Sequence, residues 1–149
     1  MIDEKWMDVA IAEAKMAEEQ GDVPVGAVVV VGDRIVGRGH NSTESLQDPT
    51  AHAEVIALSA ASATLGTWRL TDATLYVTLE PCPMCAGAII LARVKRVVFG
   101  AKEPKFGAGG SVVNLFEKGL FNHCPEVQGG VREDEIRLMM QEFFRKRRK

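Results

Sequence analysis

The sequence predicts an α/β fold, a three-layer α/β/α sandwich in which a mixed sheet of about five strands lies between two layers of helices. Segments with the apolar period of a helix alternate with short β-branched runs along the 149 residues. Two of these runs flank a Gly32-Asp33 turn, which predicts a hairpin of antiparallel strands. Strand, helix and strand then follow one another over residues 74–99, which predicts parallel neighbours. The length suits one domain, residues 1–149.

The first half of the chain predicts a helix, the two hairpin strands and a second helix. Apolar residues recur at helical spacing from Trp6 until Gly21-Asp22 ends the segment. The first hairpin strand is almost continuously apolar, as in a strand buried on both faces, and Pro24 must lie at its very start. The second helix is rich in alanine and ends at Gly66, a residue typical of that position. In order, these elements are expected over residues 3–20, 23–31, 34–39 and 51–65.

The second half predicts a strand that leads directly into Glu80-Pro81, then a helix, a further strand, a glycine-rich loop and an amphipathic C-terminal helix. The loop contains Gly107-Ala108-Gly109-Gly110, which lacks the spacing of a phosphate-binding or dinucleotide-binding fingerprint. No nucleotide cofactor is therefore expected. A short edge strand is expected to start at Val127. The two strands are expected over residues 74–79 and 96–99, and the helix between them over residues 83–92. The loop is expected over residues 102–110 and the C-terminal helix over residues 134–147.

Composition excludes several classes of protein. Hydrophobic residues make up 46% of the sequence, which excludes general disorder, and no uncharged apolar stretch is long enough to span a bilayer. The N-terminal residues lack the charged-then-apolar order of a secretory signal. Three cysteines, an odd number, argue against a disulfide framework and for a reducing compartment. We therefore expect a cytoplasmic protein with no membrane partner.

The charge pattern does not by itself require a nucleic-acid partner. The formal net charge is −2, so any site for a polyanion must be local. The densest basic run is Arg145-Lys146-Arg147-Arg148-Lys149. It could bind a polyanion, or it could complement the helix dipole, because Glu133-Asp134-Glu135 begins the same segment. The sequence leaves both interpretations open.

Two short stretches point to a metal site, His52-Ala53-Glu54 and Pro81-Cys82-Pro83-Met84-Cys85. One imidazole and two thiolates supply the three protein ligands of a catalytic zinc, which keeps its fourth position for water. If Pro83 opens a helix, Cys82 and Cys85 lie on one face of its first turn, where the helix dipole favours thiolates. The sequence therefore predicts His52, Cys82 and Cys85 as zinc ligands.

Glu54 follows His52 by two residues, about 200° around an ideal helix, so it is better placed beside the metal than on it. Asp48-Pro49-Thr50 predicts a turn and helix N-cap ahead of His52, which would let two helix N-termini converge on one cation. A lone C-x-x-C could equally be a redox pair, half a zinc ribbon or two core cysteines. Together the motifs form the zinc-deaminase signature H-x-E…P-C-x-x-C.

On these motifs the chain resembles the cytidine and deoxycytidylate deaminase superfamily and, within it, the bacterial tRNA-specific adenosine deaminases. The resemblance implies a cytidine-deaminase-like fold, one zinc ion per subunit and Glu54 as the proton shuttle. It implies a hydrolase that converts adenosine to inosine at the wobble position of a tRNA anticodon. The segments that carry the resemblance are Val23-Pro24-Val25-Gly26-Ala27, Asn41, residues 48–54, residues 76–82, residues 96–100, residues 107–111, Asn122-His123 and Phe143-Phe144-Arg145.

The same resemblance implies contacts with a tRNA anticodon stem-loop, whose target base must be splayed out to enter a pocket, and a homodimer. Glu103 stands where the family commonly has aspartate, which puts a direct substrate contact there in doubt. Of Phe143 and Phe144, one is expected to pack in the core and the other to edge the RNA groove. The implied substrate-binding residues are Asn41, Ala53, Lys102, Glu103, Lys105, His123, Phe144 and Arg145.

Several alternatives stay open at this point. Asn41 could instead bond its own turn backbone, and His123 could be a structural histidine. Cys124 is expected to be a partly buried thiol without a metal. The chain could deaminate a free base or nucleoside of the guanine or cytosine type with the same zinc chemistry. It could also be a non-catalytic RNA-binding module whose structural zinc is closed by Cys82, Cys85, His123 and Cys124.

Overall fold

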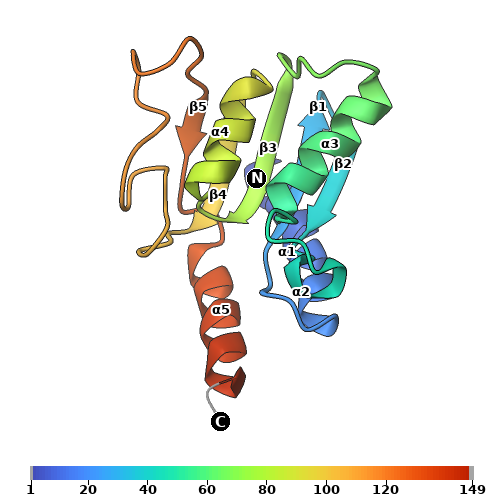
Figure 1. Ribbon diagram of the computed structural model, residues 1–149, viewed down its shortest axis with the longest axis vertical. Coiled ribbons are helices and arrows are strands. Elements are labelled where there is room, and N and C mark those ends of the chain that lie inside the picture. The colour runs from blue at the N-terminus through green and yellow to red at the C-terminus, as the bar shows by residue number, and fades with distance from the viewer. Residues whose placement is uncertain (1, 148–149) are drawn as a thin grey trace.

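The computed structural model describes residues 2–147, and its secondary structure follows the expected alternation (Figure 1). In chain order the elements are α1 (Ile2–Glu19), β1 (Gly26–Val31), β2 (Arg34–His40), α2 (Thr43–Leu46), α3 (Ala53–Leu65), β3 (Ala73–Leu79), α4 (Pro83–Leu91), β4 (Arg96–Ala101), β5 (Glu126–Gln128) and α5 (Glu133–Arg147). None of the helices in this described part of the chain is both long and apolar enough to cross a bilayer.

The sheet is mixed and has five strands in the order β2-β1-β3-β4-β5. The hairpin partner β2 and the strand β3 both run antiparallel to β1. The strand β4 runs parallel to β3 and to the short edge strand β5. The expected parallel β3-α4-β4 unit is thus confirmed, and it places the carboxyl end of β3 immediately before the N-terminus of α4.

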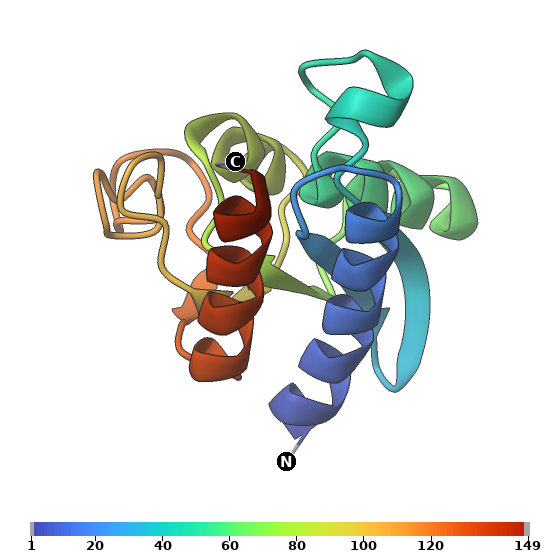
Figure 2. The same ribbon diagram turned by 90° about the horizontal axis from the view of Figure 1, so that it is seen from below.

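Helices cover both faces of the sheet, which confirms the three-layer arrangement. The helices α3 and α4 pack on one face, in a core that includes Leu75, Val77 and Ile89. The helices α1 and α5 lie side by side on the other face (Figure 2), where Met7 and Ile136 are fully buried. Two separate apolar cores therefore hold the sheet, and the N-termini of α3 and α4 face the same edge region.

The helix α3 lies unusually close to β2. A Cβ atom added to Gly39 would lie 2.5 Å from the Ala53 carbonyl oxygen, so only glycine permits this contact. Because Ala53 is the first residue of α3, this contact fixes where the helix begins. His52, the residue just before it, is thereby held against the end of the sheet.

The clearest differences from the sequence expectation are the start of β1 and a short additional helix, α2. β1 begins at Gly26 and not at residue 23, because Pro24 has no N–H to donate and Val25 bonds back to Val23 at 2.8 Å. The short helix α2 was not expected. The buried carboxylate of Asp22 accepts a hydrogen bond from the Glu44 N–H in the first turn of α2, at 2.6 Å. The two residues are far apart in the sequence, so no local pattern predicts this contact.

Candidate metal and substrate site

The two helix N-termini converge as expected. His52 is the N-cap residue of α3 and Cys82 is the N-cap residue of α4, and both adopt extended backbone conformations. Their side chains meet: His52 Nδ1 lies 3.5 Å from Cys82 Sγ and 3.5 Å from Cys85 Sγ. Within residues 2–147 these three residues form the one group of at least three potential ligands that suits a metal ion.

The spacing of these donor atoms suits zinc. Zinc–sulfur bonds of about 2.3 Å and zinc–nitrogen bonds of about 2.0 Å, set at a tetrahedral angle, place sulfur and nitrogen about 3.5 Å apart. The two separations of 3.5 Å between His52 Nδ1 and the sulfurs match this value. One imidazole and two sulfurs are also the donor set of a zinc site that keeps one position open. The residues present therefore fit the ion.

The side chains of His52, Cys82 and Cys85 perturb one another strongly. Hydrogen bonding from Cys85, followed by that from His52, lowers the pKa of Cys82 to about 4. The Cys82 thiolate in turn raises the pKa of Cys85, and burial adds to this effect. The same thiolate raises the pKa of His52. These hydrogen bonds favour the thiolate form of Cys82, the form that binds a metal ion.

Glu54 lies in the first turn of α3, beside this cluster and not in it. Its side chain is buried, and burial raises its pKa to about 7. Glu54 lines a cavity of about 220 Å³ together with Asn41, His52 and Cys82. A carboxyl group with a pKa near neutrality can both accept and donate a proton at physiological pH. The arrangement is suited to proton transfer next to a metal-bound ligand.

Asn41 follows β2 and caps α3 from a distance in sequence. Its Oδ1 accepts a hydrogen bond from the Ala53 N–H at 2.9 Å. The alternative that Asn41 bonds its own turn is therefore wrong. Asp48, expected to help cap the helix, instead bonds the N–H and hydroxyl of Thr50 within its own turn, at 2.9 Å and 2.8 Å. Asn41 thus orients the start of α3 and also faces the cavity.

Comparison of the sequence with known proteins identifies the family to which this chain belongs. A model of the MafB19-like deaminase family matches residues 1–148. A tRNA-specific adenosine deaminase of Bacillus subtilis is 54% identical over 147 residues, covering 99% of this chain and 91% of the relative. One of Agrobacterium fabrum is 45% identical, covering 96% and 94%. This chain belongs to the tRNA-specific adenosine deaminase family.

Solved structures agree with membership of this deaminase family. A structure from a study of A-to-I editing by tRNA:A34 deaminases at the wobble position matches with a TM-score of 0.87 and 44% identity, covering 91% of this chain and 98% of the other. A guanine deaminase from Nitrosomonas europaea matches with a TM-score of 0.82 and 26% identity, covering 94% and 83%. The architecture is thus shared by deaminases of a polymer and of a free base.

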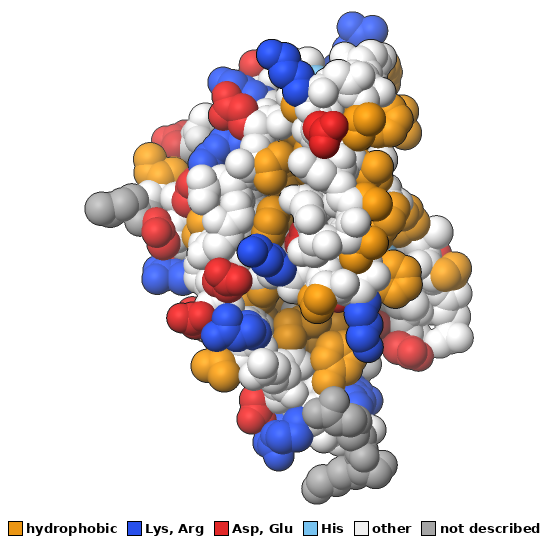
Figure 3. Space-filling view, turned by 90° about the vertical axis from the view of Figure 1, so that its left-hand side faces the viewer, with side chains coloured by type: hydrophobic (Ala, Val, Ile, Leu, Met, Phe, Trp, Pro, Cys, Tyr) orange, Lys and Arg blue, Asp and Glu red, His pale blue; other side chains and the backbone are white. Residues whose placement is uncertain are grey.

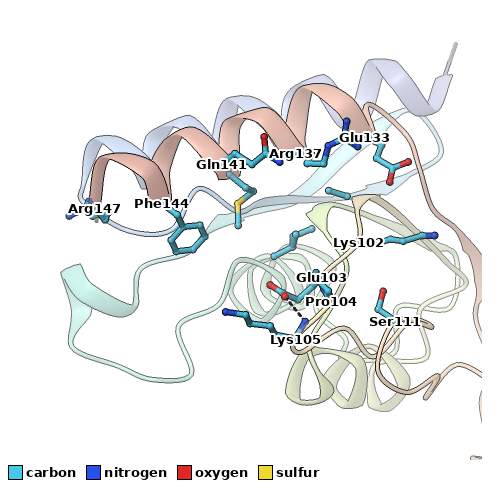
Figure 4. Close-up of a pocket in the computed structure, with 13 residues that line it drawn as sticks. Lys102, Glu103, Pro104, Lys105, Ser111, Glu133, Arg137, Gln141, Phe144 and Arg147 are labelled. Atoms are coloured by element: carbon cyan, nitrogen blue, oxygen red, sulfur yellow. Dashed lines mark hydrogen bonds between the residues drawn. The ribbon is translucent and has the colours of Figure 1, made fainter. Parts of the chain in front are cut away.

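In this member of the family, a wide groove lies between α5 and the loop after β4 (Figure 4). Its volume is about 1050 Å³, and Lys102, Glu103, Lys105 and Phe144 all line it. Glu103 and Phe144 also line the cavity that contains Glu54, so groove and cavity adjoin. Four of the expected substrate-binding residues therefore lie together, at the entrance to the cavity.

The two aromatic residues of α5 divide as expected. Phe143 is 5% exposed and packs in the core, whereas Phe144 is 43% exposed. The two rings meet edge to face, with centroids 5.2 Å apart. Figure 4 shows Phe144 pointing from α5 into the space between the helix and the loop. The packing half of the prediction is confirmed.

Other expected site residues lie outside this group. Arg145 points to solvent and pairs with Glu142 at 2.6 Å. His123 Nε2 lies 2.6 Å from the Val94 carbonyl oxygen, as in a structural histidine. Cys124 is exposed, so the expectation of a partly buried thiol was wrong, although its Sγ donates to the Phe116 carbonyl. His123 and Cys124 do not join the cluster of potential ligands, which contradicts the structural-zinc alternative.

The basic C-terminal run is only partly within the described residues, because Arg148 and Lys149 lie outside them. The part that is described forms the last turn of α5, with Arg145, Lys146 and Arg147. Since Glu133, Asp134 and Glu135 occupy the first turn, the helix has acidic and basic ends that complement its dipole. Arg147 also donates to the Gly21 carbonyl oxygen at 3.1 Å.

Proposed function

We propose that this chain is a zinc-dependent hydrolase that converts adenosine to inosine at the wobble position of a tRNA anticodon. One observation carries the proposal: the cavity with Glu54 beside three zinc-type ligands adjoins a groove lined by lysines and an exposed aromatic residue. A free nucleoside needs only the cavity, whereas an RNA loop needs a surface beyond it. The names of the family relatives support the same substrate.

In this proposal one zinc ion per subunit is held by His52, Cys82 and Cys85. When bound, zinc would supply an activated water molecule as the nucleophile near neutral pH. Glu54 is the group that would take up a proton beside these ligands and give it to the adenine ring nitrogen next to the carbon that is attacked. Water and adenosine are consumed, and inosine and ammonia are released. Burial raises the pKa of Glu54, which favours a carboxyl group that can hold a proton at this place.

The substrate contacts follow from the position of each residue. Asn41 holds the base inside the cavity, and its bond to the Ala53 N–H fixes the orientation of its amide. Lys102 and Lys105 neutralise phosphates of the anticodon loop, and Phe144 stacks on a splayed base. Glu103, which lines both the groove and the cavity, is a further proposed contact. His123 and Arg145 line neither, and we propose contacts for them only at the edge of the bound RNA.

The second candidate is a deaminase of a free base of the guanine or cytosine type, and the similarity to the guanine deaminase structure favours it. The two candidates separate in one experiment. Zinc-loaded protein is given a wobble-adenosine stem-loop, guanine, cytosine or adenosine, each at equal concentration. Release of ammonia chiefly from the stem-loop supports the tRNA substrate, and chief turnover of a free base supports the second candidate.

We further propose a homodimer of single-domain subunits, residues 1–149, that works in the cytoplasm. Apolar side chains gather on the face that carries the loop after β4 (Figure 3). The exposed apolar residues of that loop and of α4 include Leu91, Val112, Val113, Leu120 and Phe121. A surface of this kind is typical of an interface between subunits. Light scattering coupled to gel filtration tests it, since a monomer mass at micromolar concentration would contradict the dimer.

A further inference from the structure

Glu80 is a buried carboxylate that the proposed reaction does not use. The residue is 2% exposed and lies between the end of β3 and Pro81-Cys82. Its backbone N–H donates to the Ala101 carbonyl oxygen at 2.9 Å, which extends the pairing of β3 with β4 by one residue. The side chain is thus held on a rigid element, two residues from a metal ligand.

Both carboxylate oxygens of Glu80 accept hydrogen bonds from the loop after β4. Oε1 accepts from the Glu103 N–H at 3.0 Å and from the Ser111 hydroxyl at 2.5 Å. Oε2 accepts from the N–H groups of Gly109 at 2.9 Å and Ser111 at 3.0 Å. Hydrogen bonds to an ionised carboxylate are stronger than bonds between neutral groups. One side chain therefore ties both ends of residues 103–111 to the strand that leads to the zinc ligands.

The loop also packs directly on this carboxylate. A Cβ atom added to Gly107 would lie 2.5 Å from Glu80 Cδ and 2.5 Å from Glu80 Oε2, so the backbone approaches too closely for any side chain. The Ala108 N–H donates to the Pro81 carbonyl oxygen at 2.8 Å. The loop and the segment before Cys82 are thus joined by side-chain bonds, a backbone bond and close packing.

All four donors to the Glu80 carboxylate belong to the loop after β4. The folded position of the loop and the position of the Glu80 side chain therefore depend on each other.

The loop of residues 102–111 lines the groove that is proposed to bind RNA. Lys102 and Lys105 line the groove (Figure 4). Glu103 lines both the groove and the Glu54 cavity, and Phe106 lines the cavity. The side chain of Glu103 is itself held by the Lys105 N–H at 2.9 Å. Movement of the loop would therefore displace all of these side chains relative to the metal ligands.

We infer that Glu80 is a positioning residue, which holds the substrate-facing loop of residues 102–111 at a fixed place relative to His52, Cys82 and Cys85 and thereby sets the affinity for the RNA substrate. This inference rests on the proposed function. It assigns no chemical step to Glu80. Its effect acts through the loop, on substrate binding more than on the reaction itself.

Glu80→Gln tests the inference, because the amide keeps the size of the side chain but turns one oxygen into a donor that faces other donors. With a wobble-adenosine stem-loop, KM is expected to rise about tenfold while kcat changes much less, with the zinc content unchanged. Amide hydrogen exchange over residues 103–111 should be faster in the same variant. The exposed Glu117, on the same connection, gives the control Glu117→Gln, which should change neither quantity.

Ser111→Ala removes only the hydroxyl bond to Glu80 Oε1. It should raise KM and speed up amide hydrogen exchange as Glu80→Gln does, but by a smaller amount. If Glu80→Gln does not fold, Ser111→Ala provides the test. Unchanged KM and unchanged exchange in the variants would overturn the inference, as would equal losses in kcat and zinc content. A wild type that leaves the stem-loop adenosine intact would instead refute the proposed function, and the exchange data would still report on the loop.

Discussion

Asn41 has two roles, capping of α3 and the proposed contact with the base, and two substitutions distinguish them. Its Oδ1 caps α3 through the Ala53 N–H, while its amide faces the cavity. Asn41→Ala removes both and should lower the stability by about 1 kcal/mol. Asn41→Asp keeps an acceptor for the Ala53 N–H but removes the amide donor. Its melting temperature should therefore stay near that of the wild type, while deamination falls.

Calorimetry and stem-loop kinetics on both Asn41 variants measure these two effects. If Asn41→Asp melted as early as Asn41→Ala, the cap would not depend on the acceptor oxygen. Full activity in both variants would show that Asn41 has no part in holding the base.

At the scale of elements, one ion pair joins the start of α1 to β4. Asp3 accepts two hydrogen bonds from Arg96, at 2.8 Å and 2.9 Å, and one from the Tyr76 hydroxyl at 3.0 Å. The bonds from Arg96 are the main cause that lowers the pKa of Asp3 below 3.8. Burial, followed by the bond to Asp3, raises the pKa of Tyr76 to about 12. Two layers of the fold are thus joined by a charged contact at one corner.

A group whose pKa is lower in the folded protein than in the unfolded chain stabilises the fold above its unfolded pKa, and this contribution is lost as pH falls. Asp3→Asn should therefore lower the melting temperature by a few degrees at pH 7, for a loss of about 1 kcal/mol. The difference from the wild type should shrink as pH falls through the lowered pKa of Asp3. Asp8→Asn is the control, because Asp8 pairs with Arg132 in a more exposed position on the same helix. Equal shifts in both variants at pH 7 would contradict a special role for Asp3.

The contact between α3 and β2 links packing to the metal site. Gly39→Ala would drive a methyl group into the Ala53 carbonyl and push the start of α3 away from the sheet. We expect a loss of about 1–3 kcal/mol in stability and weaker zinc binding, since His52 moves with the helix. Ser59→Ala, an exposed change on the same helix, should leave both unchanged. Zinc competition assays measure the affinity for zinc in each variant. An unchanged zinc affinity in Gly39→Ala would contradict an effect of this packing on the metal site.

For the molecule as a whole, bound zinc would join the N-termini of α3 and α4, which pack on the same face of the sheet. A ligand that binds only the folded state stabilises it by mass action, so removal of zinc with a chelator should lower the melting temperature by several degrees. Cys82→Ser removes a ligand and should melt at the same temperature with or without chelator. A wild type that is indifferent to the chelator would contradict a metal held by this cluster.

The order of helices and strands and the three metal-type residues were predictable because each depends on a local pattern, such as Pro83 opening α4 or the turn at Gly32-Asp33. Long-range partners were not. The cap that Asp22 gives to α2 and the four bonds that Glu80 receives from the loop depend on segments that meet only in the fold. For the bonds of Glu80, the sequence offers only an acidic residue directly before Pro81-Cys82 and, much later, Gly107 and Ser111. Nothing in the sequence shows that these residues meet.

The tRNA substrate and the role of Glu54 are both tested by inosine formation in an anticodon stem-loop with a wobble adenosine. Inosine is measured by sequencing for the zinc-loaded wild type and for Glu54→Gln. We expect inosine from the wild type and at least about 100-fold less from Glu54→Gln, with zinc retained in both. Inosine from both proteins at similar rates would contradict the role of Glu54 as the proton shuttle. No inosine from the zinc-loaded wild type would contradict the tRNA substrate itself.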